Sequence, residues 1–491
     1  MSTTRFTWPQ LLSFRAASRD ANPLHTDPAY ARRTHFGSPV VFGALCGLRT
    51  LATAEAGPGQ TLETLEMEFR GPAFTNVEYQ LSTTVRRQDT ILRLSDGPRL
   101  LTRVVPTWCA RRAPATPAEG GGDAGRTRPA TGGVPAERTR LTGAWSPPWA
   151  QLTALVDDLG LAQAGASAFH VAAVAFASYL IGMELPGERA LFWRVHLSFP
   201  DRGPLDPEPW SWQATVDGTD ARFALTRLSA TAADGSGTVA ILQLEAFERH
   251  PPNAAPWAGL AAPDTPELAG RQALVIGASR GLGAALTRGL ALHGADVVGG
   301  SRGAPEEAGS VAAGLPDRAG EVRMLQGDAA DASWCARAVE ACTARGKGLD
   351  LLVLSASPAL RRLDLVPVAI DRIQDHVRAA IALVAQPLAA ALPALTAHRG
   401  TVVLVSSSAV SEPVPDQAHY AAAKAATEAL LRAAAAAHPD LRCIVLRPPR
   451  LDTGFTHNPS LAGAMAPARV VRTLLAALRD PTPGVRVLDA F

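Results

Sequence analysis

The sequence predicts a multidomain chain in which an α+β part, built from two similar units, precedes an α/β part with a doubly wound parallel sheet. Three observations lead to this prediction. In residues 1–112 and again in residues 144–250, an apolar helical segment is followed by stretches in which apolar and polar residues alternate. In residues 268–491, a buried strand runs through a glycine-rich turn into a helix. Residues 113–143 and 251–267 are rich in Pro, Gly and Ala, show no periodicity, and are predicted to be linkers.

The composition and charge bear on the class of protein. With 47% apolar residues, the 491-residue chain can bury sizeable cores. Its formal charge of +2, without a run of Lys and Arg, gives no reason to expect a nucleic-acid partner. The longest apolar run, near Val171 to Leu180, is shorter than the ~20 residues that span a bilayer. We therefore expect a soluble, cytoplasmic protein that does not contact a membrane. The five cysteines are scattered, so we expect reduced thiols and no metal site.

The first unit carries a polar motif between two helical segments. Asp20, Asn22 and His25 lie around Pro23, before an apolar helix that Gly43 opens. Clean alternation follows in two stretches, from Leu65 to Phe69 and from Val77 to Val85. The motif therefore places an acid and a base close together in the sequence. The alternative is that Asp20, Asn22 and Asp27 only make turn and cap hydrogen bonds.

This motif, Asp-x-Asn-Pro-x-His, resembles the hallmark of the MaoC-like, R-specific enoyl hydratases, which have the hot-dog fold. The resemblance implies that Asp20 and His25 hold a water or hydroxyl and exchange protons with it and with C2 of an acyl thioester. It also implies that Asn22 supports the loop and that a backbone N–H near Gly43 polarises the thioester oxygen. The chain departs from the family at Phe42, where relatives usually carry His before the glycine.

The second unit repeats the order of the first without its motif. An apolar helix from Ala168 to Leu180 precedes alternation from Trp193 to Phe199, which indicates an internal duplication. We therefore expect a double hot-dog with one working site, in which the second unit completes the sheet and the acyl tunnel. His170 is read as a hydrogen-bonded core residue without a chemical role.

The α/β part contains a Tyr-x-x-x-Lys sequence on an Ala-rich helix. Tyr420 and Lys424 are four residues apart and therefore share a helix face. A nearby ammonium favours phenolate, so we expect a tyrosine pKa of about 10 to fall by roughly 1 to 3 units. Ser407, at the end of the strand from Val402 to Val405, is placed to hold a carbonyl oxygen beside that proton. Alone, the pair is equally typical of an ordinary amphipathic helix.

Upstream glycines change this interpretation. Gly277, Gly281 and Gly283 open a helix after a strand, and Ser407, Tyr420 and Lys424 follow in order. From about residue 270 to 491 the chain resembles the short-chain dehydrogenase/reductase family, with a Rossmann fold that binds a nicotinamide dinucleotide. The resemblance implies a catalytic Ser407, Tyr420 and Lys424. The residues implied to bind the cofactor are Gly277, Ser279, Arg280, Gly281, Leu282, Gly283, Ser301, Arg302, Asp328, Ala329, Ser355, Ala356, Tyr420, Lys424 and Thr453.

The expected cofactor is NADPH. The second strand of this part ends in Ser301 and Arg302, with no carboxylate for the ribose hydroxyls of NAD. Arg280 and Arg302 offer planar donors to a 2′-phosphate, unless both simply face solvent. One departure concerns the family's fourth catalytic member, an asparagine that supports a water chain from the lysine to solvent. No asparagine lies between Leu351 and Arg450, so we expect a reductase that is intact or slowed.

Together, the two resemblances imply a 3-ketoacyl thioester reductase joined to a 3-hydroxyacyl thioester dehydratase, or enoyl hydratase, in biosynthesis of polyketide or fatty-acid type. The expected substrate carrier is acyl carrier protein or coenzyme A, and the expected assembly is a homo-oligomer. Three alternatives remain open. The reductase alone is active and the hot-dog pair only binds substrate; the chain is a non-catalytic interaction protein; or the ketone is not a thioester, for example a cyclic or aromatic polyketide.

Overall fold

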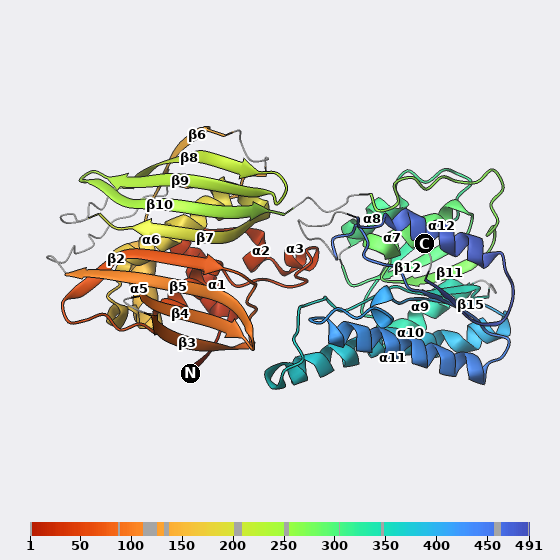
Figure 1. The fold of residues 1–491 in the computed structure, drawn as a ribbon. Coiled ribbons are helices and arrows are strands. Elements are labelled where there is room, and N and C mark those ends of the chain that lie inside the picture. Colours follow the sequence, from red (N-terminus) through yellow and green to blue (C-terminus); the bar gives the residue numbers. More distant parts are fainter. Residues whose placement is uncertain are drawn as a thin grey trace. The chain divides into compact units, whose positions relative to one another are not determined.

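The computed structural model describes residues 2–86, 89–110, 125–131, 137–200, 209–249, 255–303, 305–344, 348–455, 463–489 and 491. These residues form two compact units, of which the first ends at residue 251 and the second begins at residue 252 (Figure 1). Of the two predicted linkers, residues 113–124, 132–136 and 251–254 lie outside the described residues.

The first unit is built on one ten-stranded antiparallel sheet with the order β1-β3-β4-β5-β2-β7-β10-β9-β8-β6. The two halves join where β2 pairs with β7, in a register that sets Thr64 opposite Ser198 and Met67 opposite Val195. The predicted repeat is therefore present, and the second half completes the sheet of the first. The strands are β1 (Ser2–Arg5), β2 (Gln60–Phe69), β3 (Glu78–Arg86), β4 (Asp89–Asp96), β5 (Arg99–Ala110), β6 (Arg140–Trp145), β7 (Ala190–Ser198), β8 (Trp210–Asp220), β9 (Leu225–Asp234) and β10 (Gly237–Glu248).

Helices cover one face of this sheet (Figure 1). The central helix of each half, α4 in the first and α6 in the second, is packed in a single hydrophobic core that spans both halves. Because α6 is apolar all round, it is buried along almost its whole length. The helices are α1 (Trp8–Ser18), α2 (Pro23–Thr26), α3 (Pro28–Arg32), α4 (Gly43–Leu51), α5 (Trp149–Leu159) and α6 (Ala168–Tyr179), and α6 continues into a π-helical turn, Leu180–Glu184.

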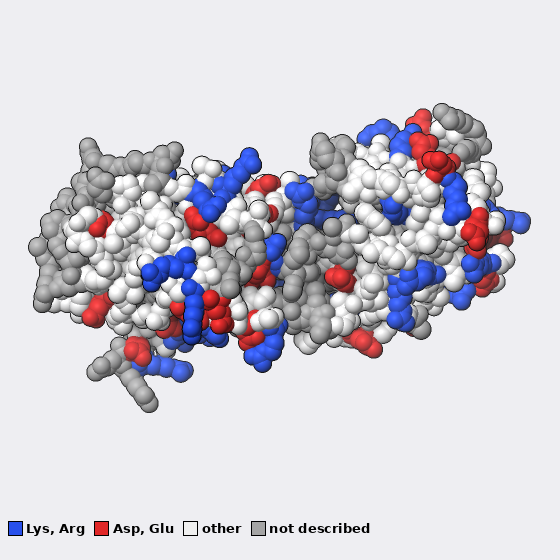
Figure 2. Space-filling view, turned by 90° about the horizontal axis from the view of Figure 1, so that it is seen from above, with Lys and Arg blue, Asp and Glu red and all other residues white. Residues whose placement is uncertain are grey.

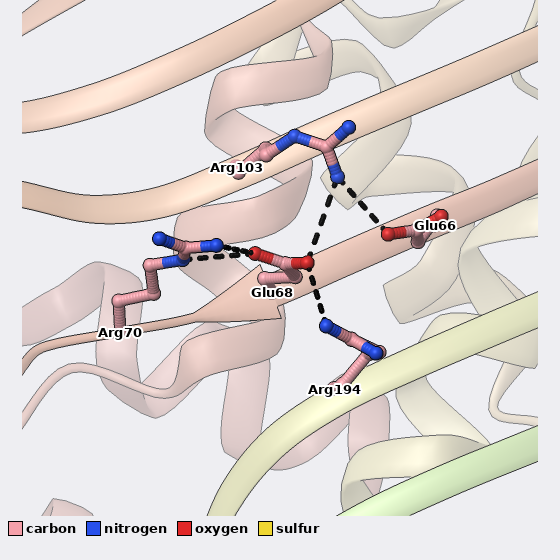
Figure 3. A network of polar contacts seen from close by, with 5 residues as sticks. All are labelled: Glu66, Glu68, Arg70, Arg103 and Arg194. Carbon is pink, nitrogen blue, oxygen red and sulfur yellow. Dashed lines mark hydrogen bonds and ion pairs between the residues drawn. The ribbon is translucent and has the colours of Figure 1, made fainter.

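The opposite face of the sheet carries an ionic network where the halves meet (Figure 3). Glu68 of β2 is buried, and its carboxylate contacts Arg70 at 2.6 Å, Arg194 of β7 at 2.9 Å and Arg103 of β5 at 3.6 Å. Burial alone would raise the pKa of Glu68, but these guanidinium groups lower it overall. The ion pair with Arg194 therefore bridges the two halves beside the β2–β7 pairing.

The first predicted linker is more ordered than the sequence suggested. Strand β6 begins at Arg140, within residues 113–143, and pairs with β8. Within the described piece 125–131, Ala130 N donates to Met183 O at 2.7 Å and Arg126 N donates to the Tyr179 hydroxyl at 2.6 Å. Backbone hydrogen bonds to the second half thus order this stretch, although it has few apolar side chains to bury. In the second predicted linker, Trp257 and Leu260 pack against the core of the α/β unit.

The second unit is a doubly wound α/β domain. Its seven strands are all parallel, in the order β13-β12-β11-β14-β15-β16-β17. The strand order reverses beside β11, which is where such sheets bind ligands at their carboxyl ends. The strands are β11 (Gln272–Ile276), β12 (Asp296–Ser301), β13 (Val322–Gln326), β14 (Leu351–Leu354), β15 (Thr401–Val405), β16 (Arg442–Leu446) and β17 (Gly484–Leu488).

Helices pack on both faces of the parallel sheet. One core contains side chains of α9, α10 and α11, and the other contains side chains of α7 and α12. The helices are α7 (Gly281–Leu292), α8 (Pro305–Ala312), α9 (Ala332–Thr343), α10 (Ile370–Ala397), α11 (Ala418–Ala437) and α12 (Pro467–Leu478). Over the face shown in Figure 2, positive and negative side chains of the described residues are intermixed.

Among the described residues, one helix is long and apolar enough to cross a membrane. It is Pro367–Ala397, which includes α10, and 33% of its most apolar window is buried. It is a different segment from the apolar run near Val171 to Leu180. A core helix of a soluble protein passes the same test, and α10 packs against α9, α11 and β14.

Candidate active sites

The polar motif of the first unit forms a loop between α1 and α2. Helix α1 ends at Arg19, which adopts a left-handed conformation with φ 57°. Asn22 then caps α2 by accepting a hydrogen bond from Leu24 N at 3.1 Å. The Asn22 amide also donates to Gly182 O at 3.3 Å and to Gly187 O at 3.1 Å, so the second half anchors the loop. Asp27 caps α3 through Ala29 N and Tyr30 N, a purely local role.

Asp20 has a different environment from Asp27. It is 2% exposed, and its carboxylate accepts hydrogen bonds from Ser178 Oγ at 2.7 Å and from Asn22 N at 3.0 Å. Burial raises the pKa of Asp20 to about 7, although both hydrogen bonds oppose the rise. Near neutral pH this carboxyl group is therefore poised to give or take a proton.

His25 lies on α2, directly after this loop, and its backbone N–H donates to Asn22 O at 3.2 Å. Ring Nδ1 is 2.7 Å from Val40 O. Because a carbonyl oxygen only accepts, Nδ1 must carry the proton, and Nε2 of the neutral ring is a base. Burial lowers the pKa of His25 to about 4, so the ring is neutral at pH 7. The imidazole stacks on Phe42 with ring centroids 4.0 Å apart. The residue that departs from the family pattern thus orients His25.

Gly43 opens α4 directly after Phe42. The first hydrogen bond of this helix runs from Cys46 N to Phe42 O at 3.0 Å, which leaves the N–H groups of residues 43–45 without a partner inside the helix. A β carbon at Gly43 would lie 3.0 Å from the Phe69 ring. The predicted polarising role of this N–H group remains a prediction.

Sequence reasoning missed Ser178 and Gly182, which come from the second half. A β carbon at Gly182 would overlap Asp20 Oδ1 and lie 2.6 Å from Oδ2. Gly182 belongs to the π-helical turn that follows α6, a distortion that is frequent at functional sites. The sequence signal was Gly182 within an otherwise apolar helical run.

We expect Gly182→Ala to abolish chemistry at Asp20 and to destabilise the first unit by about 1–3 kcal/mol, because the new methyl displaces the carboxylate. Thermal unfolding and the rate of the expected thioester dehydration measure the two effects. Gly218→Ala is the matched control, because its β carbon would meet Glu137 only at an ordinary 3.7 Å. Equal behaviour of the two variants would contradict the placement of Gly182 against Asp20.

In the second unit, the predicted trio gathers at the carboxyl end of β15. Ser407 lies close enough to the Tyr420 hydroxyl to lower its pKa, and Lys424 Nζ donates to Val405 O at 2.8 Å. The ammonium lies 5.6 Å from the centre of the Tyr420 ring. The helix spacing and the end of the strand therefore bring these residues together.

The predicted direction of the Tyr420 pKa shift was wrong. Burial raises the pKa of Tyr420 above its usual value of 10, and only the Ser407 hydrogen bond lowers it. Burial also lowers the pKa of Lys424 to about 8, opposed by Glu428. Helix spacing revealed the nearby ammonium, but desolvation of both groups outweighs its attraction.

A buried carboxylate behind this trio was not predicted. Glu428 accepts hydrogen bonds from Ser406 Oγ at 2.6 Å and from Arg447 Nη2 at 2.6 Å. Burial would raise the pKa of Glu428, but these partners lower it overall. Glu428 is four residues beyond Lys424, so its spacing was the available signal. The hydrogen bond to Glu428 holds Ser406, next to Ser407, in place and so stabilises the end of β15.

The glycine turn has a shape that fits a dinucleotide phosphate. Gly277 and Gly281 have φ of +85° and +54°, which favour glycine. A β carbon at Gly283 would overlap Gly277 O, and one at Gly281 would point at Thr453, 3.6 Å away. The turn leads into the N-terminus of α7, where backbone N–H groups are available to an anion.

Other predicted cofactor residues gather at the same edge of the sheet. Ser355 N donates to Ile276 O at 3.0 Å, and a β carbon at Gly277 would lie 2.8 Å from Ala356 N. Ser301 is buried at the end of β12. Arg302 lies 3.9 Å from Asp328, and both side chains are about half exposed. The remaining predicted residues are Ser279, Arg280, Leu282 and Ala329; of these Arg280 is exposed, Ser279 is partly buried, and Leu282 and Ala329 are buried. Among the described residues, no three His, Cys, Asp or Glu side chains are grouped to hold a metal ion.

Comparison with known proteins finds two family matches. A MaoC like domain matches residues 3–96, and a short chain dehydrogenase matches residues 271–461. A curated relative, the (R)-specific enoyl-CoA hydratase of Aeromonas caviae, is 35% identical over 92 residues, which cover 17% of this chain and 67% of that protein.

Solved structures similar to the chain are dehydrogenases. An alcohol dehydrogenase from Thermococcus sibiricus, complexed with 5-hydroxy-NADP, is 24% identical and covers 44% of this chain and 95% of its own, with a TM-score of 0.41. A carveol dehydrogenase from Mycobacterium avium, in complex with NAD, is 22% identical and covers 46% and 98%, with a TM-score of 0.42. A dehydrogenase/reductase from Sinorhizobium meliloti 1021 is 24% identical and covers 45% and 94%, with a TM-score of 0.39.

Proposed function

Because the chain belongs to the MaoC-like hydratase family through its N-terminal part and carries a short-chain dehydrogenase domain in its C-terminal part, we propose that it is a bifunctional enzyme. One site is an NADPH-dependent 3-ketoacyl thioester reductase, and the other is a 3-hydroxyacyl thioester dehydratase. The observation that carries this proposal is that each unit holds its own acid–base set in buried surroundings. These sets are Asp20 with His25, and Ser407 with Tyr420 and Lys424.

In the dehydratase, His25 acts as the base and Asp20 as the acid. Neutral His25 takes the C2 proton of the 3-hydroxyacyl thioester at Nε2, while Nδ1 donates to Val40 O. Asp20 gives its proton to the C3 hydroxyl, which leaves as water. The opposite pKa shifts of the two residues suit these roles, because one group holds a proton at neutral pH and the other does not. Backbone N–H groups at the start of α4 offset charge on the thioester oxygen.

In the reductase, Tyr420 gives its proton to the ketone oxygen while Ser407 holds that oxygen. The glycine turn from Gly277 to Gly283 would hold NADPH, which would supply the hydride for the carbonyl carbon. The raised pKa of Tyr420 keeps its proton in place until the oxygen gains charge. Lys424 is mainly an ammonium at pH 7, since its pKa is about 8, and it stabilises the tyrosinate that forms.

The two reactions follow one another chemically. The reductase yields a 3-hydroxyacyl thioester, which is the substrate of the dehydratase, and joining the sites in one chain raises its effective concentration. We infer acyl carrier protein or coenzyme A as the carrier, and a biosynthetic pathway of polyketide or fatty-acid type. The inferred cytoplasmic location and homo-oligomeric state rest on the sequence and on the family resemblance.

The direct test mixes the purified protein with NADPH and short 3-ketoacyl thioesters on each carrier. We expect nicotinamide absorbance to fall and mass spectrometry to find 2-enoyl thioesters. If only the 3-hydroxyacyl product accumulates, the proposed reductase activity is supported and the proposed dehydratase activity is wrong. Absence of any absorbance change at high enzyme concentration would defeat the reductase.

Dehydration is expected to be fastest between about pH 4 and pH 7. Below pH 4, His25 becomes protonated and cannot accept the C2 proton; above pH 7, Asp20 loses the proton that it must donate. The measurement is kcat/KM for enoyl formation from a 3-hydroxyacyl thioester as a function of pH. A rate that keeps rising through pH 7 and beyond would contradict Asp20 as the acid.

Selectivity for NADPH is expected to depend on Arg302, which follows Ser301 at the end of β12. Arg302→Ala removes a charge-assisted contact with the 2′-phosphate, so the KM for NADPH should rise by about tenfold and that for NADH should stay unchanged. Arg337→Ala, an exposed arginine on α9, is the control. Equal losses with both cofactors would show that Arg302 does not read the phosphate.

A further inference from the structure

The interior of the α/β unit holds two histidines that the mechanism above does not use. His419 precedes Tyr420 on α11 and is 0% exposed. His376 lies in the second turn of α10 and is partly exposed. Their rings meet edge to face, with centroids 4.5 Å apart. The pair therefore extends from the fully buried neighbour of Tyr420 toward the surface.

The ring nitrogens of this pair are buried without hydrogen-bond partners among the described residues. They are both nitrogens of His419 and Nε2 of His376. The backbone of Arg361 acts on His419 and raises its pKa. Buried polar atoms in proteins are nearly always hydrogen-bonded, so three unpaired nitrogens together call for an explanation.

The charged and titratable groups around the pair come from three segments. His376 faces His419 and Lys424 from α11 and Arg361 from the segment before α10. Asp416 acts on His419 from the start of α11 and also lies 3.4 Å from Arg362. Burial, together with His419, Lys424 and Arg361 nearby, lowers the pKa of His376 to about 4. Both rings are therefore neutral at pH 7, and each can donate one hydrogen bond and accept another.

Lys424 sits at the inner end of this arrangement. Its ammonium has three N–H donors, of which one meets Val405 O at 2.8 Å. Each reduction leaves Tyr420 without its proton, and the chain must replace that proton from solvent before the next turnover. A buried lysine with a lowered pKa can supply it only if the lysine is recharged in turn.

We propose that His376 and His419 are positioning residues that hold a proton path, completed by water, from solvent to Lys424. The hydride adds to the carbonyl carbon, the Tyr420 O–H bond breaks, and a substrate O–H bond forms. Tyrosinate then takes a proton from Lys424, and the lysine amine takes one from the path. One proton enters from solvent per turnover, so ketone, NADPH and a proton give alcohol and NADP⁺. This inference rests on the reductase activity proposed above.

The test compares His376→Ala and His376→Phe with His398→Ala, an exposed histidine at the end of the same helix. The first two variants should lower kcat for ketone reduction by roughly tenfold, leave KM unchanged and increase the solvent deuterium isotope effect. Added imidazole should restore the alanine variant, which has room for it, and not the phenylalanine variant. The control should behave as the wild type.

An NMR measurement that needs no substrate tests this inference separately from the proposed function. With tyrosine labelled at Cζ, the chain gives signals from only four tyrosines, and Tyr420→Phe identifies that of Tyr420. The signal should shift as pH falls through the titration of His376, and His376→Phe should remove that step. If the wild-type protein does not reduce ketones, the proposed reductase activity is wrong, but this NMR measurement still tests the proton path. The proton path is wrong if His376→Phe has the wild-type kcat, or if the pH dependence of the Tyr420 signal is the same in this variant as in the wild type.

Discussion

Replacing Tyr420 by Phe should lower the rate of NADPH-dependent ketone reduction by roughly 10²- to 10⁴-fold, the range that a positioned general acid contributes. The phenol is the proton donor that meets Ser407 in the site, and the substitution removes only its oxygen. The ring stays 5.6 Å from Lys424 Nζ, and Lys424 keeps its bond to Val405 O. The loss should therefore appear in kcat, with little change in the binding of NADPH.

Absorbance of NADPH measures the rate, and a thermal-shift titration measures cofactor binding. The second reaction is the internal control, because the same preparation should dehydrate a supplied 3-hydroxyacyl thioester at the wild-type rate. Retention of more than a tenth of the reductase rate would show that another group donates the proton. In that case His419, the adjacent buried residue, would be the next residue to replace.

The sequence predicted the features that depend on spacing along the chain. Alternating apolar residues predicted the strands of both halves, and the glycine spacing predicted the turn before α7. The sequence also predicted that Ser407, Tyr420 and Lys424 lie together, because Ser407 follows the end of one strand and the other two residues share one face of a helix. These are short-range consequences of strand and helix geometry.

Features that depend on distant partners were missed. Ser178 and Gly182 reach Asp20 from the other half of the duplicated sheet, and although Gly182 interrupts an apolar helical run, no local pattern links either residue to Asp20. The first four residues of β6, Arg140 to Gly143, fall within the predicted linker because the stability of this strand comes from pairing with β8. The pKa of Tyr420 was predicted in the wrong direction because burial, which a sequence does not display, outweighs the nearby ammonium.

Phe42 illustrates how a departure from a family pattern can be read once the structure is known. From the sequence alone, it removes a polar side chain beside Gly43. In the structure it is fully buried, packs against Phe14 and supports the imidazole of His25 by stacking. The hydrogen bond from Nδ1 to Val40 O fixes the ring as well, so a polar group at position 42 is not required for its orientation.

Asp20→Asn should abolish dehydration, with a fall in kcat of about 10²- to 10⁴-fold, and leave ketone reduction unchanged. An amide cannot donate a carboxylic proton, yet it occupies the same volume. Its oxygen can still accept from Asn22 N, and the Ser178 hydroxyl can turn to accept from the new NH₂ group. The fold of the loop should therefore survive, and the 3-hydroxyacyl thioester should accumulate.

The matched control is Asp27→Asn, the same substitution in the same loop. Asp27 is exposed and caps α3 through Ala29 N and Tyr30 N, and asparagine caps helices equally well. Mass spectrometry of products formed from a 3-ketoacyl thioester and NADPH distinguishes the variants. Enoyl formation should stop in Asp20→Asn and continue in Asp27→Asn. If both variants form the enoyl product at the wild-type rate, dehydration does not occur at this loop, and the duplicated sheet serves only to bind the acyl chain for the reductase.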